Sequence, residues 1–520
     1  MLKKVRILWV DDEIDLLRPH ILFLEDKGYE LSTASNGGDA IDEVRNSAYD
    51  LIFLDENMPG LSGLETLTKI KEIGPDIPVV MITKSEAEDM MDAAIGSQIS
   101  DYLIKPVNPN QILLSIKKNI DNKKLITTKT TSDYQSQFGN IGMQISAAAA
   151  FSDWSEIYKK LVFWELELDK SQDSSMNEVF LMQKNEADIE FGKYIKKNYI
   201  DWLKPDCETR PLLSPNVIKS AVLPELKKSG QTVFILIDNL RFDQWRVIQP
   251  IIKDYYQVED EKTYCSILPT STQYARNAIF AGLMPLAIQE LYPNLWLNDD
   301  DEGSKNDYEE QLLNNQLQRF GIKAKVYFEK IFSSRTGDKV IDNLNNILQN
   351  DFVVLVYNFV DILSHANTDM EMIKELASND SAYRSLTLSW FQHSHLMELF
   401  RELSNRNIKI ILTTDHGTIR VNKPIKVVGD KSTSKNLRYK LGKNLSYNLR
   451  DVFEISKPEK AYLPKTTLSS KYIFALNTDF FAYPNNYNYY VNYYVNTYQH
   501  GGISMEEMIL PLVTLQSKQF

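Results

Sequence analysis

The sequence contains little cysteine and no long hydrophobic run. Only two cysteines occur among 520 residues, so a disulfide scaffold is excluded and a reducing compartment is favoured. No apolar stretch approaches the ~20 residues that a membrane span needs. The start, MLKKVRILWVDDE, places acids directly after a short apolar run, unlike a cleavable signal sequence. These absences predict a cytoplasmic protein without membrane insertion.

The chain also lacks an excess of basic residues. It carries 58 basic and 70 acidic residues, a net charge of -12, which disfavours binding to nucleic acid by overall charge. A local basic groove remains possible. With 43% hydrophobic and 25% charged residues, the composition is that of a globular protein. The length predicts roughly three or four domains at ~150 residues each.

The first predicted domain covers residues 1–121 and alternates strand-like runs with helical patterns. The strand-like runs are VRILWV, YELSTA, DLIFLD, PVVMIT and DYLI. They are continuous apolar runs, which indicates strands buried on both faces. Strict alternation with helices predicts a parallel, doubly wound α/β sheet.

The second predicted domain, residues 122–206, is a helical connector. Its polar start, DNKKLITTKTTSDYQSQFGN, is typical of either a loop or a solvated helix extension. No Gly or Pro occurs between Gly142 and Gly192, and large apolar side chains recur there at helical spacing. We therefore expect a small helical bundle.

The third predicted domain, residues 207–520, follows the breaker-rich stretch KPDCETRPLLSPN and is a second α/β domain. Its buried-strand runs are TVFILID, DFVVLVYN and IKIILTTD. Each ends in polar or charged residues, at the sheet edge where α/β proteins bind ligands. A Lys-rich segment and the Tyr/Asn-rich residues 483–498 follow. Lysines pair with phosphates and bases stack on tyrosines, but a Tyr/Asn-rich loop or edge strand is the preferred interpretation.

Acidic residues end several strands of the first domain. Asp11 and Asp12 end the first run and Asp55 the third, while Thr83 ends the fourth and Lys105 follows the fifth. Such a carboxylate cluster suits Mg²⁺, which would reduce the repulsion between Asp55 and an incoming phosphoryl group. Any single strand-end acid is more often only solvated, but five such residues in this order favour a site.

These motifs resemble a response-regulator receiver domain through VDDE, LDENMPG, MIT and DYLIKP. The resemblance implies a CheY-like (βα)5 fold and phosphorylation by a sensor histidine kinase. It assigns Asp55 as phosphoacceptor, Asp11, Asp12, Asp55 and the backbone of Asn57 to Mg²⁺, Thr83 and Tyr102 as the switch pair, and Lys105 to the phosphoryl group.

The third domain carries a longer set of acids and histidines. The candidate ligands are Asp238, Asp361, His365, Asp415, His416 and His500. Asp and His without cysteine favour zinc or a similar ion, and six ligands suffice for two ions that clamp a displacement at phosphorus. Thr272, just before a helical pattern, is the candidate nucleophile, with Thr270 and Ser271 as competitors. Arg276, one turn further on, reaches either a substrate phosphate or an ordinary salt bridge.

Residues 211–520 resemble the PglZ-type branch of the alkaline phosphatase superfamily. The shared motifs are ILIDNLRFD, LPTSTQYARNAIFAG, TTDHG and HGGISMEEMILP. A sulfatase is disfavoured because Cys-x-Pro-x-Arg is absent there. The resemblance implies one zinc site formed by Asp238, Thr272, Asp415 and His416 and a second formed by Asp361, His365 and His500.

Together the domains resemble the PorX-type response regulators, whose PglZ-type output domain serves type IX secretion and gliding. This resemblance implies a zinc-dependent phosphodiesterase acting on cyclic or linear oligonucleotides, a homodimer formed on phosphorylation, and contact with a sigma factor. Two alternatives remain: a non-catalytic, protein-binding regulator with structural zinc, and a phosphomonoesterase.

Overall fold

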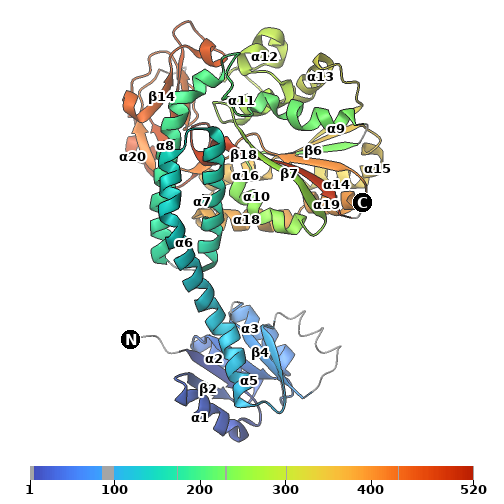
Figure 1. Cartoon of the computed structure of the whole chain (residues 1–520), viewed down its shortest axis with the longest axis vertical. Coiled ribbons are helices and arrows are strands. Elements are labelled where there is room, and N and C mark those ends of the chain that lie inside the picture. Colours follow the sequence, from blue (N-terminus) through green and yellow to red (C-terminus); the bar gives the residue numbers. More distant parts are fainter. Residues whose placement is uncertain are drawn as a thin grey trace. The chain divides into compact units, whose positions relative to one another are not determined.

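The computed structural model describes residues 5–75, 77–84, 99–171, 174–228, 231–299, 301–430 and 433–518. Figure 1 shows the chain, which divides into two compact units. The first unit comprises Met1–Gln135 with Lys170–Asp173, and the second comprises Ser136–Asp169 with Ser174–Phe520.

The first unit contains a five-stranded sheet in the order β2-β1-β3-β4-β5, and every neighbouring pair is parallel. This is the doubly wound order 2-1-3-4-5, so the predicted receiver-type fold is confirmed. The strands are β1 (Arg6–Val10), β2 (Glu30–Ala34), β3 (Leu51–Asp55), β4 (Val79–Thr83) and β5 (Asp101–Ile104). The helices are η1 (Ile14–Leu17), α1 (Arg18–Asp26), α2 (Gly37–Asn46), α3 (Gly63–Ile73) and α5 (Pro109–Ile116).

Alternate residues of the central strands pack into two separate cores. Leu8 and Val10 of β1 belong to the cluster on one face, and Ile7 and Trp9 belong to the cluster on the other. The prediction that all five strands are buried on both faces is wrong for β2 and β5, which expose several residues. Both are edge strands, each with one pairing neighbour.

Long helices form the connector. A π-helical turn, η2 (Lys117–Asp121), leads into α6 (Asn122–Ala147), α7 (Phe151–Ser171) and α8 (Ser174–Trp202). The polar stretch after residue 121 is therefore a helix, not a loop. The division into units falls within α6 and places most of α7 and α8 in the second unit, so the boundaries at residues 121 and 206 stay a prediction. Trp154, Tyr158 and Leu161 are buried, as their helical spacing predicts.

The second unit is organised around a mixed six-stranded sheet in the order β7-β18-β10-β6-β9-β8. The three predicted runs form the parallel centre, β10-β6-β9, and β8 extends it in parallel. β18 and β7 pair antiparallel on the other side. The strands are β6 (Thr232–Ile237), β7 (Tyr256–Cys265), β8 (Val326–Ile331), β9 (Phe352–Tyr357), β10 (Lys409–Thr413) and β18 (Ile509–Ser517).

Helices cover both faces of this sheet. Figure 1 shows α9, α11 and α13 on one side and α10, α18 and α19 on the other. The helices near the site are α10 (Phe242–Ile252), α11 (Thr272–Ala281), α14 (Ser334–Asp342), α16 (Phe359–Asp369), α18 (Asp380–Gln392) and α19 (His395–Ser404). The others are η3 (Ser214–Asn216), η4 (Ile218–Val222), α9 (Leu223–Lys227), α12 (Pro285–Leu291), η5 (Pro293–Leu295), α13 (Glu309–Arg319), α15 (Leu344–Ile347), α17 (Glu371–Leu376), η6 (Leu449–Asp451), η7 (Pro458–Ala461), α20 (Tyr487–Tyr494) and α21 (Met505–Met508).

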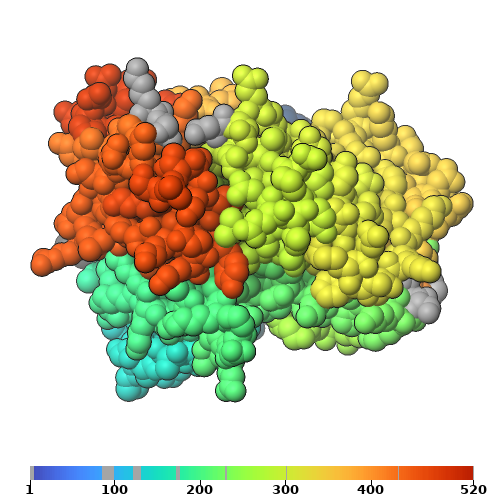
Figure 2. All heavy atoms as spheres, turned by 90° about the horizontal axis from the view of Figure 1, so that it is seen from above, coloured from blue at the N-terminus to red at the C-terminus, as the bar shows by residue number. Residues whose placement is uncertain are grey.

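Small sheets lie outside the main sheet, and the sequence patterns did not predict them. They pair β11 (Ile419–Arg420) with β17 (Tyr498–Gln499), β12 (Lys423–Lys426) with β16 (Asp479–Ala482), and β13 (Tyr439–Gly442) and β14 (Val452–Ile455) with β15 (Lys471–Ala475). Figure 2 shows this orange region beside the yellow-green region around α12, where Leu286 N donates to Tyr462 O at 2.8 Å. Within the Tyr/Asn-rich segment, α20 replaces the expected loop or edge strand.

Candidate metal and phosphotransfer sites

Three acids meet at the carboxyl edge of the receiver sheet. Asp11 follows β1 and Asp55 ends β3, and both are buried, whereas Asp12 is exposed. A ligand oxygen from each lies within 4.8 Å of the others. The three acids that the sequence predicts to converge therefore do lie together, and their role as ligands of a cation stays a prediction.

Lys105 closes this receiver site. Its Nζ lies 2.9 Å from Asp11 Oδ2 and 3.0 Å from Asp55 Oδ1. Burial raises the pKa of Asp55, and the hydrogen bond from Lys105 opposes that shift. Burial also disfavours the charged lysine, but hydrogen bonds with both acids raise the pKa of Lys105 overall. The lysine thus holds a positive charge beside the candidate phosphoacceptor.

The predicted switch residues occupy different environments. Thr83, at the end of β4, is buried, whereas Tyr102 in the edge strand β5 is 40% exposed. Asn57 is exposed in the loop that follows β3. Thr83 therefore lies at the sheet edge that carries the acids, whereas Tyr102 lies on the surface.

In the second unit, candidate ligands follow three adjacent parallel strands. Asp238 follows β6, Asp415 and His416 follow β10, and Asp361 lies in the first turn of α16 after β9. Asp238, Asp415 and His416 form one fully buried group with ligand atoms within 4.8 Å. Parallel strands that end at one edge account for their convergence.

A second group consists of Asp361, His365 and His500, also within 4.8 Å. Asp361 and His365 are four residues apart on α16, so they share one face, as predicted. His365 Nε2 lies 3.5 Å from Asp361 Oδ2, and His500 Nε2 lies 3.9 Å from Asp361 Oδ1. The rings of His416 and His500 stack with centroids 4.2 Å apart, so the two groups adjoin.

Thr272 lies at the first group. It is the first residue of α11, and its Oγ1 is 3.0 Å from Nε2 of His416. Thr270 is buried and donates from Oγ1 to Gly502 O at 2.7 Å, while Ser271 is the N-cap residue of α11. Of the three candidate nucleophiles, Thr272 is the one whose hydroxyl contacts a ligand of the cluster.

Arg276 forms a buried ion pair. Its Nη1 donates to Asp238 Oδ2 at 2.5 Å and its Nε donates to Glu309 Oε1 at 2.6 Å. Lys330 Nζ also lies 2.9 Å from Glu309 Oε2. This arrangement corresponds to the salt-bridge alternative for Arg276; the assignment to substrate binding stays a prediction.

Sequence reasoning missed two asparagines that hold the acids in place. Asn239 adopts a left-handed backbone with φ of 65°, and its N–H donates to Asp415 Oδ1 at 3.4 Å. Its side-chain Nδ2 donates to Asp361 Oδ1 at 3.3 Å. Asn358 Nδ2 donates to Asp238 Oδ2 at 3.1 Å. The sequence could have indicated both asparagines, because they come just after β6 and β9, at the carboxyl edge of the sheet where the candidate ligands lie.

Burial shapes the electrostatics of this centre. It raises the pKa of Asp415 well above the ordinary value, with the adjacent Asp238 adding to the shift, and it raises the pKa of Asp361 to about 6. Burial lowers the pKa of His416, and burial with the neighbouring histidines lowers that of His500 well below the ordinary value. The protein alone therefore leaves buried carboxylates short of positive charge.

The lysines and tyrosines that were considered for substrate binding differ in how far solvent reaches them. Lys440 is buried, donates to Ser434 O at 3.0 Å and lies over the Tyr483 ring. Lys423 Nζ lies 3.5 Å from Asp479, and Lys431 lies outside the described residues. In α20, Tyr489 is 65% exposed. The tyrosines thus keep an accessible face, whereas Lys440 does not.

Family models match nearly the whole length of the chain in three segments. Residues 217–515 match the BREX system PglZ alkaline phosphatase-like domain, more than half of the chain. Residues 124–203 match the PorX response regulator linker domain, and residues 7–117 match the response regulator receiver domain. Among the helices of the described ranges, none has the length and apolar character needed to cross a membrane.

Curated relatives share a shorter segment. The chain is 34% identical over 140 residues to the transcriptional regulatory protein ZraR of Klebsiella oxytoca, covering 27% of this chain and 32% of the relative. It is 36% identical over 120 residues to the alginate biosynthesis transcriptional regulatory protein AlgB of Pseudomonas syringae pv. tomato, covering 23% and 27%. The chain therefore spans less than a third of the length of these relatives.

Solved structures of receiver domains are also similar. A CheY-like receiver domain protein from Methanospirillum hungatei JF-1 is 29% identical, with a TM-score of 0.23 over 23% of this chain and 96% of that chain. A two-component response regulator from Clostridium difficile is 30% identical, with a TM-score of 0.22 over 23% and 97%. Alkaline phosphatase-like and receiver domains generally use metal ions. This chain belongs to the PglZ alkaline phosphatase-like family, and it carries that domain together with a PorX-type linker and a response regulator receiver domain.

Proposed function

We propose that this chain is a response regulator in which phosphorylation of Asp55 controls a zinc-dependent phosphodiesterase within residues 207–520. The observation that carries the proposal is the 3.0 Å contact between Thr272 Oγ1 and His416 Nε2 at the start of α11. It supports Thr272 as the nucleophile, because the hydroxyl lies beside an Asp/His cluster and at a helix N-terminus, which favours phosphoryl oxygens. The PglZ family match supports phosphoester chemistry.

The ligand groups fit two metal ions. Asp238 Oδ1 and Asp415 Oδ2 are buried and receive no hydrogen bond from any residue that the structure describes, so both oxygens need a cation. Asp238, Thr272, Asp415 and His416 would hold one zinc ion. Asp361, His365 and His500 would hold the second. When bound, zinc supplies a Lewis acid that offsets charge developing on the phosphoryl oxygens and favours loss of the Thr272 proton.

The chain's own residues account for the remaining steps. Thr272 Oγ forms a bond to phosphorus as the bond from phosphorus to the leaving alcohol breaks, and the alcohol takes up a proton. Backbone N–H groups at the start of α11 orient the phosphoryl oxygens. Water then attacks phosphorus, the Thr272–phosphorus bond breaks, and a phosphomonoester leaves.

The receiver supplies the control. Asp55 would accept a phosphoryl group from a sensor histidine kinase, with Mg²⁺ held by Asp11, Asp12, Asp55 and the backbone of Asn57. Lys105 already contacts Asp55 and would pair with the phosphoryl group. Thr83 and Tyr102 would then move inward and alter the receiver surface.

The connector contacts the effector close to His500. Lys184 of α8 lies 3.1 Å from Glu506 Oε1, and the N–H of Met505 donates to Asp188 Oδ1 at 3.0 Å. These contacts support transmission through α8 to the loop that holds His500. We propose that phosphorylation acts by forming a homodimer. The PorX-type likeness supports cyclic or linear oligonucleotide substrates, contact with a sigma factor, and a role in type IX secretion and gliding. The same likeness supports a cytoplasmic location.

Zinc content and hydrolysis test the enzymatic part. Elemental analysis should find two zinc ions per chain. Wild type should hydrolyse an aryl phosphodiester faster than the matching monoester, Thr272→Ala should lose that activity, and Thr272→Ser should keep part of it. Equal rates for wild type and Thr272→Ala, or no hydrolysis with zinc bound, would contradict the enzyme and favour the non-catalytic regulator. A faster reaction with the monoester would indicate a phosphomonoesterase.

Light scattering tests the control. Beryllofluoride with Mg²⁺ should double the apparent mass of the wild-type chain, because it occupies the place of the phosphoryl group at Asp55. Asp55→Ala should stay at the monomer mass. A mutant that dimerises as readily as wild type would contradict phosphorylation control.

A further inference from the structure

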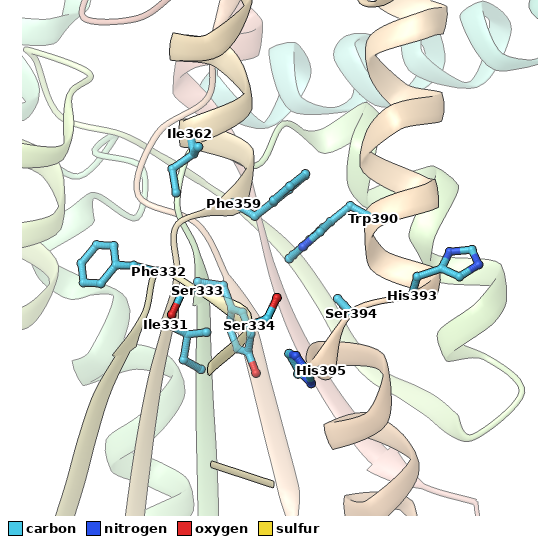
Figure 3. Close-up of a pocket in the computed structure, with 11 residues that line it drawn as sticks. Ile331, Phe332, Ser333, Ser334, Phe359, Ile362, Trp390, His393, Ser394 and His395 are labelled. Carbon is cyan, nitrogen blue, oxygen red and sulfur yellow. The ribbon is translucent and has the colours of Figure 1, made fainter. Parts of the chain in front are cut away.

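The ligands of the second metal group stand on two kinds of support. Asp361 and His365 belong to helix α16, whose Phe359 ring stacks on Trp390 with centroids 4.5 Å apart and planes inclined by 3°. Figure 3 shows the Phe359 ring pointing toward Trp390 of α18, so packing against a neighbouring helix fixes α16. His500 instead lies in the turn between β17 and α21. A ligand on a turn needs hydrogen bonds from other residues to hold its ring in place.

Two glycines shape the turn that carries His500. Gly501 has φ of 121°, in the left-handed region that side chains disfavour, and a Cβ there would lie 2.8 Å from Asn436 Oδ1. A Cβ on Gly502 would lie 2.6 Å from Ala475 O at the end of β15. The backbone of the turn is therefore packed too closely for side chains, and it has none of its own after His500 with which to anchor the ring.

Thr270 contacts the turn at three consecutive residues. Its Oγ1 donates to Gly502 O at 2.7 Å and accepts from the N–H of Gly501 at 3.1 Å. Its carbonyl oxygen lies 3.3 Å from Nδ1 of His500. The Thr270 side chain is fully buried, so water does not compete for these hydrogen bonds. One residue thus holds both the backbone of the turn and the ring of the histidine.

The carbonyl contact determines which nitrogen of His500 carries the hydrogen. A backbone carbonyl only accepts, so Nδ1 donates to Thr270 O and Nε2 keeps its lone pair. Nε2 is the nitrogen that faces the second group, 3.9 Å from Asp361 Oδ1. Histidines that bind a metal through one nitrogen commonly donate the other N–H to a carbonyl or carboxylate. The ring is therefore in the tautomer that a metal ligand needs.

A buried ion pair holds the opposite side of the turn. Glu507 Oε1 accepts from the N–H of Gly502 at 2.8 Å, and Arg438 Nη2 donates to Glu507 Oε2 at 2.5 Å. Both side chains of this pair are fully buried. Loss of the Thr270 hydroxyl would therefore release one side of the turn while the other stays bonded. The expected result is a shift of His500, with the fold intact.

We propose that Thr270 is a positioning residue for the second zinc ion. Its carbonyl selects the tautomer of His500, and its hydroxyl holds the turn that carries the ring. The proposal rests on the zinc-dependent function proposed above and gives a role to a threonine that is not the nucleophile. Thr270 lies two residues before Thr272, so one loop positions both the nucleophile and a ligand of the second ion.

Zinc affinity of the full chain tests this role without turnover. Competition with a chelating dye measures the affinity for each of the two ions. Loss of a hydrogen bond behind a metal ligand typically weakens metal binding by roughly 10–100-fold, so Thr270→Val should weaken one of the two affinities by that factor and leave the other unchanged. Thr270→Ser, which keeps the hydroxyl, should restore most of the loss.

Thr387→Val is the matched control. Thr387 is also fully buried, and its Oγ1 also donates to a carbonyl, Tyr383 O at 3.0 Å, and accepts from an N–H, Gln244 Nε2 at 2.7 Å. It lies on α18 and contacts no residue of the two metal groups through these bonds. Thr387→Val should therefore keep both zinc affinities, although it loses the same kinds of hydrogen bond.

A double variant identifies the ion concerned. His500→Ala removes the ligand itself, so adding Thr270→Val to it should cause no further loss of zinc affinity. Unchanged zinc binding in Thr270→Val, weakening of both ions, or the same loss in the His500→Ala background would overturn the proposal. A wild type that binds one ion would also overturn it, because His500 would then have no ion to hold.

The tautomer gives a readout that needs no change at Thr270. In the zinc-free wild-type chain with ¹⁵N-labelled histidines, the His500 signal, identified by its absence in His500→Ala, should be that of a ring with hydrogen on Nδ1. Hydrogen on Nε2 would overturn the proposal. If the chain binds two zinc ions but does not hydrolyse the phosphodiester, the proposed function fails, and the zinc affinities still decide the role of Thr270.

Discussion

Both acidic sites of this chain lie at the carboxyl edge of parallel strands, but different cations neutralise them. In the receiver, Lys105 bridges two acids and keeps 14% of its side chain exposed. In the effector, Arg276 bridges Asp238 and Glu309 and is 3% exposed. A lysine that solvent can reach can change partners when a phosphoryl group arrives. A buried arginine that donates one hydrogen bond to each of two carboxylates from its rigid planar head instead holds both carboxylates in place.

The histidines make the second difference. The receiver acids have no histidine in their cluster, so their oxygens suit Mg²⁺, which keeps part of its water. The effector groups combine acids with His365, His416 and His500, a donor set that suits zinc. In the function we propose, the first site accepts one phosphoryl group on Asp55, and the second moves phosphoryl groups from substrate to water.

Nucleophile removal should give the largest effect. Thr272→Ala should lower kcat/KM for an aryl phosphodiester by roughly 10³-fold or more, because the Thr272 hydroxyl contacts the imidazole of His416, whereas the hydroxyls of Ser266, Ser364 and Thr414 are engaged with backbone carbonyls. The measurement is steady-state hydrolysis with zinc content checked in each protein. Asp55→Ala, the matched change in the receiver, should retain the unstimulated rate. If both variants lose the same activity, the division of roles between the two sites is wrong.

Replacing the bridging cation should destabilise the effector site more than the receiver site. Arg276→Met removes the arginine from Asp238 and leaves Glu309 with Lys330, and it should cost about 3–5 kcal/mol in the free energy of unfolding because the Asp238 carboxylate stays buried. Lys105→Met should cost about 1–2 kcal/mol, because water and Mg²⁺ can reach the receiver acids.

Hydrogen exchange in urea, followed in peptides from β6 and β3, measures the two units separately in the full chain. Arg276→Lys serves as the control, since it keeps the charge but loses the planar guanidinium that donates to Asp238 and Glu309 at once. Equal costs for Arg276→Met and Lys105→Met would show that burial does not distinguish the two cations.

Lys440 extends the comparison to a buried lysine that forms no ion pair with any acid in the described ranges. Burial lowers its pKa to about 7, and Ser434 O and the Tyr483 ring are its contacts. Between about pH 7 and its unfolded value of ~10.4, the unfolded chain binds a proton that the folded chain does not, so stability rises with pH.

We expect the β13–β15–β14 region to gain about 2 kcal/mol between pH 7 and pH 9. Lys440→Met should remove this dependence, while Lys423→Met, at an exposed lysine, should leave it in place. Hydrogen exchange of β15 peptides, corrected for intrinsic rates, measures the change. A wild-type stability that is flat over this range would mean that Lys440 stays charged when folded.

Continuous apolar runs explain why much of the fold was predictable. TVFILI, FVVLVY and KIILT are buried because helices cover both faces, and their parallel pairing brings the polar residues that follow them to one edge. That rule alone located Asp238 and Asp415. The i, i+4 spacing located Asp361 and His365 once a helix was expected there.

The two elements that were missed have different causes. The residues of β7, YQVEDEKTYC, are mostly polar, and the strand forms because β18, some 250 residues later, pairs with it from Cys265 to Tyr256. That pairing leaves no local periodic signal. In α20, stacking of Tyr489 on Tyr493 at i, i+4 supports a helix that composition disfavours, so the spacing of the tyrosines was the available signal.

Asn239 gives the smallest expected effect and tests the acid-bearing turn itself. In the effector, the residue after the strand-end acid has φ of 65°; in the receiver, Glu56 follows Asp55 and is not among the positive-φ residues. Asn239→Ala should be about 1 kcal/mol less stable than Asn239→Gly, because a Cβ disfavours the left-handed backbone and both variants lose the same side-chain hydrogen bonds. At Glu56 the order should reverse or vanish, since no left-handed conformation is needed. Peptide-resolved exchange of β6 and β3 in the four variants measures both differences, and an alanine that matches glycine at Asn239 would show that the turn relaxes without strain.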